Sequence, residues 1–112
     1  MEFWHNPRCA KSREALSLLQ EKGIAPEIRE YLKTPPNKEE LTALIVKLGI
    51  KALDLVRKTE PIFKDEFKGK ELSESEWVEV MVEHPKLIER LILIEGNKAV
   101  VGRPPVLVLD LL

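Results

Sequence analysis

The stretch FWHNPRCAKSREALSLLQEKGIAPEIREYL, residues 3–32, predicts a strand, a helix and a second strand in that order. Its first two apolar residues form a short strand that the following Asn-Pro pair ends. The next segment has a helical stripe of apolar residues and closes at Gly23, a residue type that commonly follows a helix. Residues 26–32 form the second predicted strand. Because a strand–helix–strand unit usually pairs its strands in parallel, this stretch predicts an α/β fold.

The chain beyond this unit is predicted to be mainly helical as far as residue 89. Asn37 and Glu40 have the spacing of a capping box, and so do Ser73 and Glu76, so each pair marks a helix start. We therefore expect a helical insertion over about residues 37–89 within a single domain that spans residues 1–112.

The C-terminal segment contains a predicted hairpin. The apolar runs LILIE and KAVV are separated by Gly96 and Asn97, a pair of residue types that favours a tight turn. If this hairpin joins the sheet of the first unit, the result is a mixed sheet of about four strands. The tail VLVLDLL fits either a strand or a helix, because its alternation favours the first and the two prolines before it favour the second.

Composition limits the possible functions and locations. The chain has 112 residues and a net charge of −1, so no general attraction to nucleic acid or to an anionic membrane is expected. No apolar run approaches the roughly 20 residues of a membrane span, and no signal peptide is evident. The single cysteine cannot form an internal disulfide, which fits a reducing compartment. We therefore expect a cytoplasmic protein.

That cysteine, Cys9, lies at the predicted start of the first helix. A lone cysteine is often a small buried hydrophobic residue, and this interpretation stays open. The polar neighbours of Cys9 favour a different one, because the amides and the positive dipole end of a helix start stabilise a thiolate. Arg8 and Arg13 would add to this effect, and His5 would do so if it were charged. The alternative interpretation is therefore a reactive thiol.

The same helix start is suited to an anion. The thiol could attack the central atom of a bound oxyanion or a sulfur atom of a disulfide partner. Ser12 stands where a Cys-x-x-Cys redox pair has its second cysteine, so a second thiol must come from outside the chain.

Three later arginines are candidates to bind an oxyanion. A planar guanidinium suits a tetrahedral oxyanion, although most single arginines are surface charges. Arg57 follows a predicted helix, while Arg90 and Arg103 lie at the two ends of the predicted hairpin, which should turn back to the same side. No metal-ligand spacing is evident in the sequence, so no metal site is expected.

These motifs resemble those of the arsenate reductases of the glutaredoxin-coupled type and their relatives. Five segments carry the resemblance, in order along nearly the whole chain: HNPRCAKSR (5–13), YLKTPPNKEEL (31–41), LVRKTEP (55–61), HPKLIER (84–90) and VVGRPPVLVLDLL (100–112). The resemblance implies a thioredoxin-like fold with a helical insertion, and a helical tail. The chain departs from the family at several positions. Leu91 stands where the family usually has proline after the residue equivalent to Arg90, Ala10 stands where the arsenate enzymes tend to have glycine, and the VRKTEP segment is one residue short. A peptide bond before leucine is expected to be trans.

The resemblance also implies a reaction. Cys9 would attack arsenate, glutathione would then attack the thiol adduct as a co-substrate, and glutaredoxin would release arsenite, with no bound cofactor and with the protein acting as a monomer. The roles implied by position are nucleophile for Cys9, tuning of its ionisation for His5, support of the loop and thiolate for Ser12 and Arg13, and oxyanion binding for Arg57, Arg90 and Arg103.

Alternatives remain at the level of the sequence, among them a protein that keeps the fold but has lost the chemistry, which Leu91 suggests. Another is a related thiol reductase with a different substrate. A third is a regulator similar to the Spx-like proteins, which bind RNA polymerase without enzymatic activity. Those regulators usually carry a Cys-x-x-Cys switch, of which Ser12 removes the second half here.

Overall fold

The computed structural model describes residues 1–89 and 91–112, and within it the chain forms two compact units. One unit joins Met1–Thr34 to Arg90–Leu112, and the other consists of Pro35–Glu89. The first unit carries the sheet, and its elements are β1 (Glu2–Trp4), α1 (Ala10–Glu21), β2 (Glu27–Arg29), β3 (Ile92–Glu95), β4 (Lys98–Val101) and the 3₁₀ helix η3 (Pro105–Leu111).

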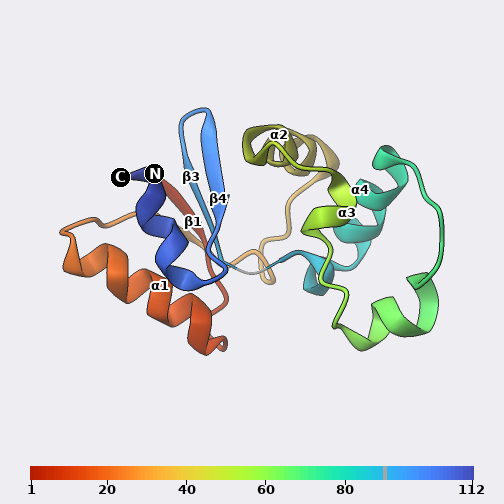
Figure 1. The fold of residues 1–112 in the computed structure, drawn as a ribbon, viewed down its shortest axis with the longest axis horizontal. Helices are drawn as coiled ribbons and strands as arrows, with labels where there is room; N and C mark the ends of the chain where they lie inside the picture. Colours follow the sequence, from red (N-terminus) through yellow and green to blue (C-terminus); the bar gives the residue numbers. More distant parts are fainter. Residues whose placement is uncertain (90) are drawn as a thin grey trace. The chain divides into compact units, whose positions relative to one another are not determined.

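The four strands form one mixed sheet with the order β2-β1-β3-β4, and β1, β3 and β4 are labelled in Figure 1. β1 pairs with β2 in parallel, and the other two pairings are antiparallel. The predictions of a parallel strand–helix–strand unit, of a hairpin and of a mixed sheet are therefore confirmed. Gly96 has φ +57° in the hairpin turn, a left-handed conformation that this kind of two-residue turn requires and that glycine adopts without strain.

The second predicted strand is shorter than residues 26–32. β2 ends at Arg29 because the chain turns there: the carbonyl oxygen of Glu30 accepts hydrogen bonds from the amides of Lys33 and Thr34 at 2.9 and 3.0 Å. Tyr31 is buried in this turn, and its ring lies 6.2 Å from that of Trp4.

The register brings three chain segments to the same end of the sheet. Trp4 at the end of β1 lies opposite Ile92 at the start of β3, and Ile92 lies opposite Val101 at the end of β4. Neighbouring strands are about 4.8 Å apart. The loop that follows β1 and the segment that follows β4 therefore leave the sheet at the same end.

The core of this unit lies between the sheet and two helices. α1 contacts η3, which also contacts β3 and β4. The tail is thus helical, as the resemblance implies. The buried side chains that make up this core are Phe3, Ala15, Leu19, Leu91, Leu93 and Val108.

Leu91 and Gly102 approach each other closely in this core. A Cβ atom on Gly102 would lie 1.9 Å from the Leu91 side chain and 2.9 Å from that of Val108, so any larger residue would force these core side chains to shift. The amide of Gly102 donates to the Leu91 carbonyl at 2.9 Å. Leu91 has φ +50°, an unusual value for a leucine, and its buried side chain holds it there.

The Pro35–Glu89 unit is helical, and both predicted capping boxes are present. Asn37 and Glu40 begin one helix, and Ser73 and Glu76 begin another. Helices α2 and α4 contact each other, as do α3 and α4. The elements of this unit are α2 (Lys38–Leu48), α3 (Ala52–Leu55), the π-helical turn η1 (Phe63–Phe67), α4 (Glu74–Glu83) and the 3₁₀ turn η2 (Pro85–Leu87).

Candidate thiol site

Cys9 occupies the N-cap position of α1, with extended backbone angles of φ −94° and ψ 121°. Its amide donates to the Asn6 carbonyl at 3.0 Å, and its carbonyl accepts from the Arg13 amide at 3.1 Å. The predicted location at a helix start is therefore confirmed. α1 is a helix of 12 residues without an acidic side chain in its first turn, so its amide dipoles favour an anion at this position.

Ser12 joins the helix to the loop before it. Its hydroxyl oxygen accepts from the Asn6 amide at 3.1 Å and lies 2.7 Å from Nδ1 of His5. Ser12 is completely buried and His5 is nearly so. Buried polar groups of this kind are costly unless they are paired, so this network fixes the loop between β1 and α1.

Arg13 holds the same loop from the other side. Its Nη1 donates to the Pro7 carbonyl at 3.0 Å. Within the loop, the Arg8 amide donates to Oδ1 of Asn6 at 3.1 Å. Ser12 and Arg13 both make hydrogen bonds to the loop, as expected for residues that support it. Asn6, which the sequence did not single out, takes part in three hydrogen bonds within the described residues.

His5 is a neutral ring near pH 7. Burial is the main cause that lowers its pKa below the ordinary 6.5; the Glu30 carboxylate opposes this, and the Arg13 cation lowers the pKa further. The sequence predicts that His5 assists the thiolate only if its ring is charged. At neutral pH it lacks that charge, so its influence runs through the hydrogen bond to Ser12.

Cys9 itself is 7% exposed. Its surroundings along the chain remain polar, because His5, Ser12 and Arg13 form one hydrogen-bonded group with the loop that ends at Cys9. Burial alone fits a structural cysteine, whereas the helix start and this network fit a reactive one. The structure therefore brings together the four residues to which a role in thiol chemistry was assigned.

Arg103 follows β4 in the same unit. The register places this segment and the Cys9 loop at the same end of the sheet, since Trp4, Ile92 and Val101 are aligned. Arg103 is exposed, and its amide donates to the Val101 carbonyl at 2.9 Å; its peptide bond to Pro104 is cis. Arg90 and its bond to Leu91 lie outside the described residues.

Arg57 belongs to the Pro35–Glu89 unit. Its guanidinium pairs with the Glu60 carboxylate and lies 4.0 Å from that of Glu89, and its side chain is 15% exposed. Its amide donates to the Leu87 carbonyl at 2.7 Å. A bound oxyanion would therefore compete with two carboxylates for this guanidinium, a feature that the sequence motif did not indicate.

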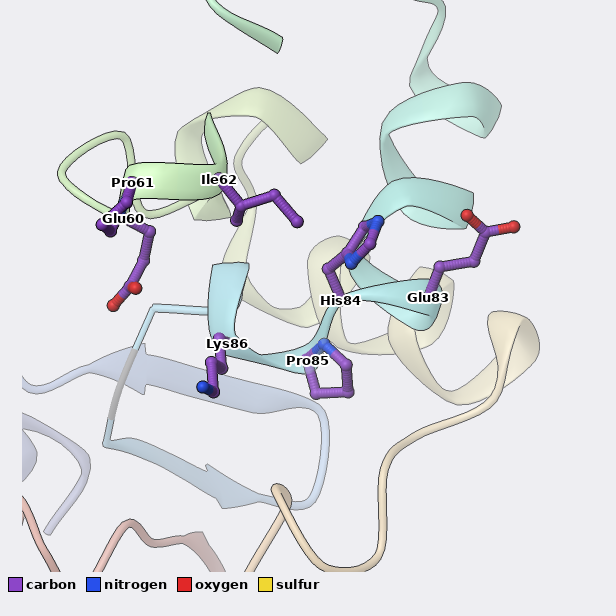
Figure 2. A pocket seen from close by; sticks show the side chains of 7 residues that line it. All are labelled: Glu60, Pro61, Ile62, Glu83, His84, Pro85 and Lys86. Carbon is purple, nitrogen blue, oxygen red and sulfur yellow. The ribbon is translucent and has the colours of Figure 1, made fainter. Parts of the chain in front are cut away.

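A cavity of about 480 Å³ is present in the Pro35–Glu89 unit (Figure 2). The side chains of Ile62 and His84 extend toward each other across it. Three of its lining residues are apolar and the others mix both signs of charge, so no single ligand chemistry is indicated. The residues that line it are Glu60, Pro61, Ile62, Glu83, His84, Pro85 and Lys86.

Two features of the described residues bear on the kind of site. Across residues 1–89 and 91–112, no group of three or more His, Cys, Asp or Glu side chains could hold a metal ion. In the same part of the chain, none of the helices combines the length and apolar character needed to cross a membrane.

The fold and the site define a class, an α/β protein with a cysteine at the start of the helix that follows the first strand. The model of the ArsC family matches residues 4–111, and the chain belongs to that family. The predicted family, thioredoxin-like fold and oxidoreductase class are confirmed.

Individual relatives agree with this assignment. An uncharacterized protein, YfgD, of Escherichia coli is 42% identical over 99% of this chain and 95% of its own length. An arsenate reductase of Haemophilus influenzae is also 42% identical, over 98% of this chain and 97% of its own. The solved structure of an arsenate reductase from Vibrio cholerae has a TM-score of 0.95 and 43% identity, and the match covers 100% of this chain and 98% of that one.

Proposed function

We propose that this protein is an arsenate reductase in which the thiolate of Cys9 attacks arsenate, with glutathione as co-substrate and glutaredoxin as partner. The observation that carries the proposal is the position of Cys9 as N-cap of α1, at the end of a loop held by Ser12 and Arg13. The relatives named arsenate reductase, which match nearly the whole chain, support arsenate as the substrate.

The single cysteine determines how electrons must flow. Cys9 forms a sulfur–arsenic bond while one arsenate oxygen leaves as water. Arsenic must then accept two electrons to pass from the +5 to the +3 state. Two thiols supply these two electrons when they join as a disulfide. The chain has a single cysteine and cannot form a disulfide within itself, so two thiols from outside must be oxidised. Glutathione and the glutaredoxin thiol are the proposed donors and leave joined as a mixed disulfide. Water then cleaves the sulfur–arsenic bond, which releases arsenite and restores the Cys9 thiolate.

The arginines have the proposed role of holding the oxyanion. Arg103 is favoured by the register, which brings its segment to the end of the sheet from which the Cys9 loop leaves. Arg57 and Arg90 are proposed on the family motifs. Guanidinium groups would neutralise the arsenate charge that otherwise repels an attacking thiolate. We also infer a monomeric protein that acts in the reducing cytoplasm, where Cys9 stays a thiol.

A coupled assay tests the proposal. It follows arsenate-dependent oxidation of NADPH in the presence of glutathione, glutaredoxin and glutathione reductase. Turnover should require each component and should fall at least about 1,000-fold in Cys9→Ser, because a hydroxyl is a far weaker nucleophile than a thiolate. Glu27→Gln, on the exposed strand β2, is the matched control and should retain turnover. Equal turnover in wild type and Cys9→Ser would contradict the proposal.

The same assay tests the oxyanion site. Arg103→Ala and Arg57→Ala should raise the KM for arsenate about tenfold or more, as expected when a charge-assisted contact is lost. Lys98→Ala, an exposed cation on β4, is the control for general charge and should leave KM unchanged. An unchanged KM in both arginine variants would remove them from the site.

A further inference from the structure

The parallel pairing of β1 and β2 places a carboxylate beside His5. Trp4 lies opposite Arg29, and the His5 amide continues the ladder by donating to the Arg29 carbonyl at 2.8 Å. The next aligned pair is therefore His5 and Glu30. Trp4 and Arg29 share one face of the sheet, because the guanidinium lies 5.1 Å from the Trp4 ring. Side chains alternate along a strand, so His5 and Glu30 point to the opposite face.

That opposite face is the one that α1 covers. The Phe3 ring lies 5.5 Å from the His5 ring and belongs to the core that contains Ala15 and Leu19 of α1. Ser12 of α1 contacts His5 directly. Glu30 therefore lies on the side of the sheet that carries the thiol site, and its charge acts on the His5 ring in the direction that favours protonation.

The two charged side chains that act on His5 have opposite effects on its protonation. Arg13 on α1 disfavours the imidazolium, whereas Glu30 after β2 favours it. Lys33 lies 3.5 Å from Glu30 but is 77% exposed, so solvent screens it. On the other side of β1, the register that pairs Trp4 with Ile92 continues to Leu91 opposite His5, and leucine carries no charge. Glu30 is thus the carboxylate that counterbalances Arg13 at this ring.

The direction of the hydrogen bond between His5 and Ser12 depends on the proton at Nδ1, which the imidazolium carries and the neutral Nε2–H tautomer lacks. The Ser12 oxygen already accepts from the Asn6 amide. When Nδ1 carries no proton, the Ser12 hydroxyl donates to it. When the ring is an imidazolium, Nδ1–H donates to Ser12 instead, and the hydroxyl proton becomes available to another acceptor. Cys9 is the N-cap of α1 and Ser12 is its third helical residue, and an N-cap side chain faces this third position.

We propose that Glu30 is a positioning residue for the thiol site: its carboxylate governs the protonation of His5 and, through it, the direction of the Ser12 hydrogen bond beside Cys9. The consequence for catalysis rests on the proposed function of Cys9, whereas the effect on His5 does not. No signal in the motifs marks Glu30; the parallel register reveals it.

The first test is an NMR titration of the His5 ring, assigned by its loss in His5→Gln. In Glu30→Gln the titration midpoint of His5 should shift to lower pH than in wild type. The matched control is Glu27→Gln, which removes the same charge from the same strand but from the opposite face, and its His5 midpoint should equal that of wild type. A midpoint that does not move in Glu30→Gln, or that moves equally in both variants, would overturn the proposal.

The second test follows the link to Cys9 through the rate of its alkylation by iodoacetamide as a function of pH. The wild-type profile should contain a step at the His5 midpoint, and that step should move to lower pH in Glu30→Gln. A merely structural role for Glu30 would change the rate without moving the step. If the His5 midpoint moves and the alkylation profile does not, the relay through Ser12 is wrong. Neither measurement uses arsenate. A failure of this proposal can therefore be told apart from a failure of the proposed arsenate reductase function in the coupled assay.

Discussion

Helix α4 begins with Ser73 and has Glu76 three residues later, whereas α1 begins with Cys9 and has Ser12 at the same spacing. In α4 the two side chains serve the helix itself: the Ser73 hydroxyl accepts from the Glu76 amide at 3.2 Å, and the Glu76 carboxylate accepts from the Ser73 amide at 2.9 Å. The hydrogen bond from the Ser73 amide is the main cause that lowers the pKa of the Glu76 carboxyl, and the Ser73 side chain lowers that pKa further.

In α1 the same two positions serve the site. Ser12 contacts the Asn6 amide and the His5 ring, and Cys9 stands where a capping oxygen is usually found. The first turn of α4 holds Glu74 and Glu76, and that of α1 holds no acidic residue. The two helix starts therefore differ in charge: α4 neutralises the positive end of its dipole with its own carboxylates, whereas the first turn of α1 has no carboxylate and can stabilise another anion.

The largest expected effect comes from Cys9→Ser, which gives α1 an ordinary capping residue. Arsenate turnover should fall at least about 1,000-fold because the nucleophile is lost. The free energy of unfolding should stay within about 1 kcal/mol of wild type, because serine is a good N-cap residue. Urea unfolding of the two proteins measures this. A loss of stability large enough to explain the inactivity would show that Cys9 is chiefly a core residue.

Ser12→Ala should give the next largest effect. It leaves the Asn6 amide and the His5 ring without a buried partner, which costs about 1–3 kcal/mol of unfolding free energy. The variant should also slow the alkylation of Cys9, because the loop that presents the thiol is less well held. Ser17→Ala, at an exposed position of the same helix, is the control and should change stability by less than about 0.5 kcal/mol. Similar losses in both variants would mean that the Ser12 network contributes nothing of its own.

Ser73→Ala tests the other side of the comparison. It should cost about 1 kcal/mol through the loss of the α4 cap and should leave turnover per folded molecule unchanged. Thermal or urea unfolding measures the cost, with the neighbouring exposed Ser75→Ala as control. If Ser73→Ala lowers kcat while the protein remains folded, the division between a structural and a functional helix start is incorrect.

The smallest effect is the pH dependence that His5 contributes to stability. Its pKa is lowered in the folded state, so the unfolded chain binds a proton more readily. The contribution of His5 is complete above its unfolded value of about 6.5 and is lost as the pH falls through the folded pKa. Urea unfolding between pH 5 and pH 8 should show this loss in wild type but not in His5→Gln. An identical slope in both proteins would indicate that burial does not control this ring.

Much of the fold could be predicted from local patterns. The capping boxes at Asn37 and Ser73, the hairpin turn at Gly96 and the helix start at Cys9 all depend on residues close together in the sequence. The tail could not be assigned from its own periodicity, because its packing against α1 and β4 decides its conformation. The length of β2 was overestimated since the turn at Glu30 depends on hydrogen bonds to two later amides.

Part of the site could also be predicted, because its residues lie close together in the sequence. His5, Cys9, Ser12 and Arg13 lie in one short motif, and the structure joins them. The neutral state of His5 follows from its burial, which no sequence pattern measures. The charge of Glu30 reaches the site only through strand register, and the fit of Leu91 against Gly102 depends on packing between segments that the motifs treat separately.

The most direct test of the central account is the rate of Cys9 alkylation by iodoacetamide with and without arsenate. If the start of α1 holds a thiolate beside an oxyanion site, Cys9 should react at pH 6 nearly as fast as at pH 8, and saturating arsenate should slow it at least about tenfold. A rate that rises about 100-fold over the same two pH units and is unaffected by arsenate would contradict the account, because it would describe an ordinary thiol with no oxyanion site next to it.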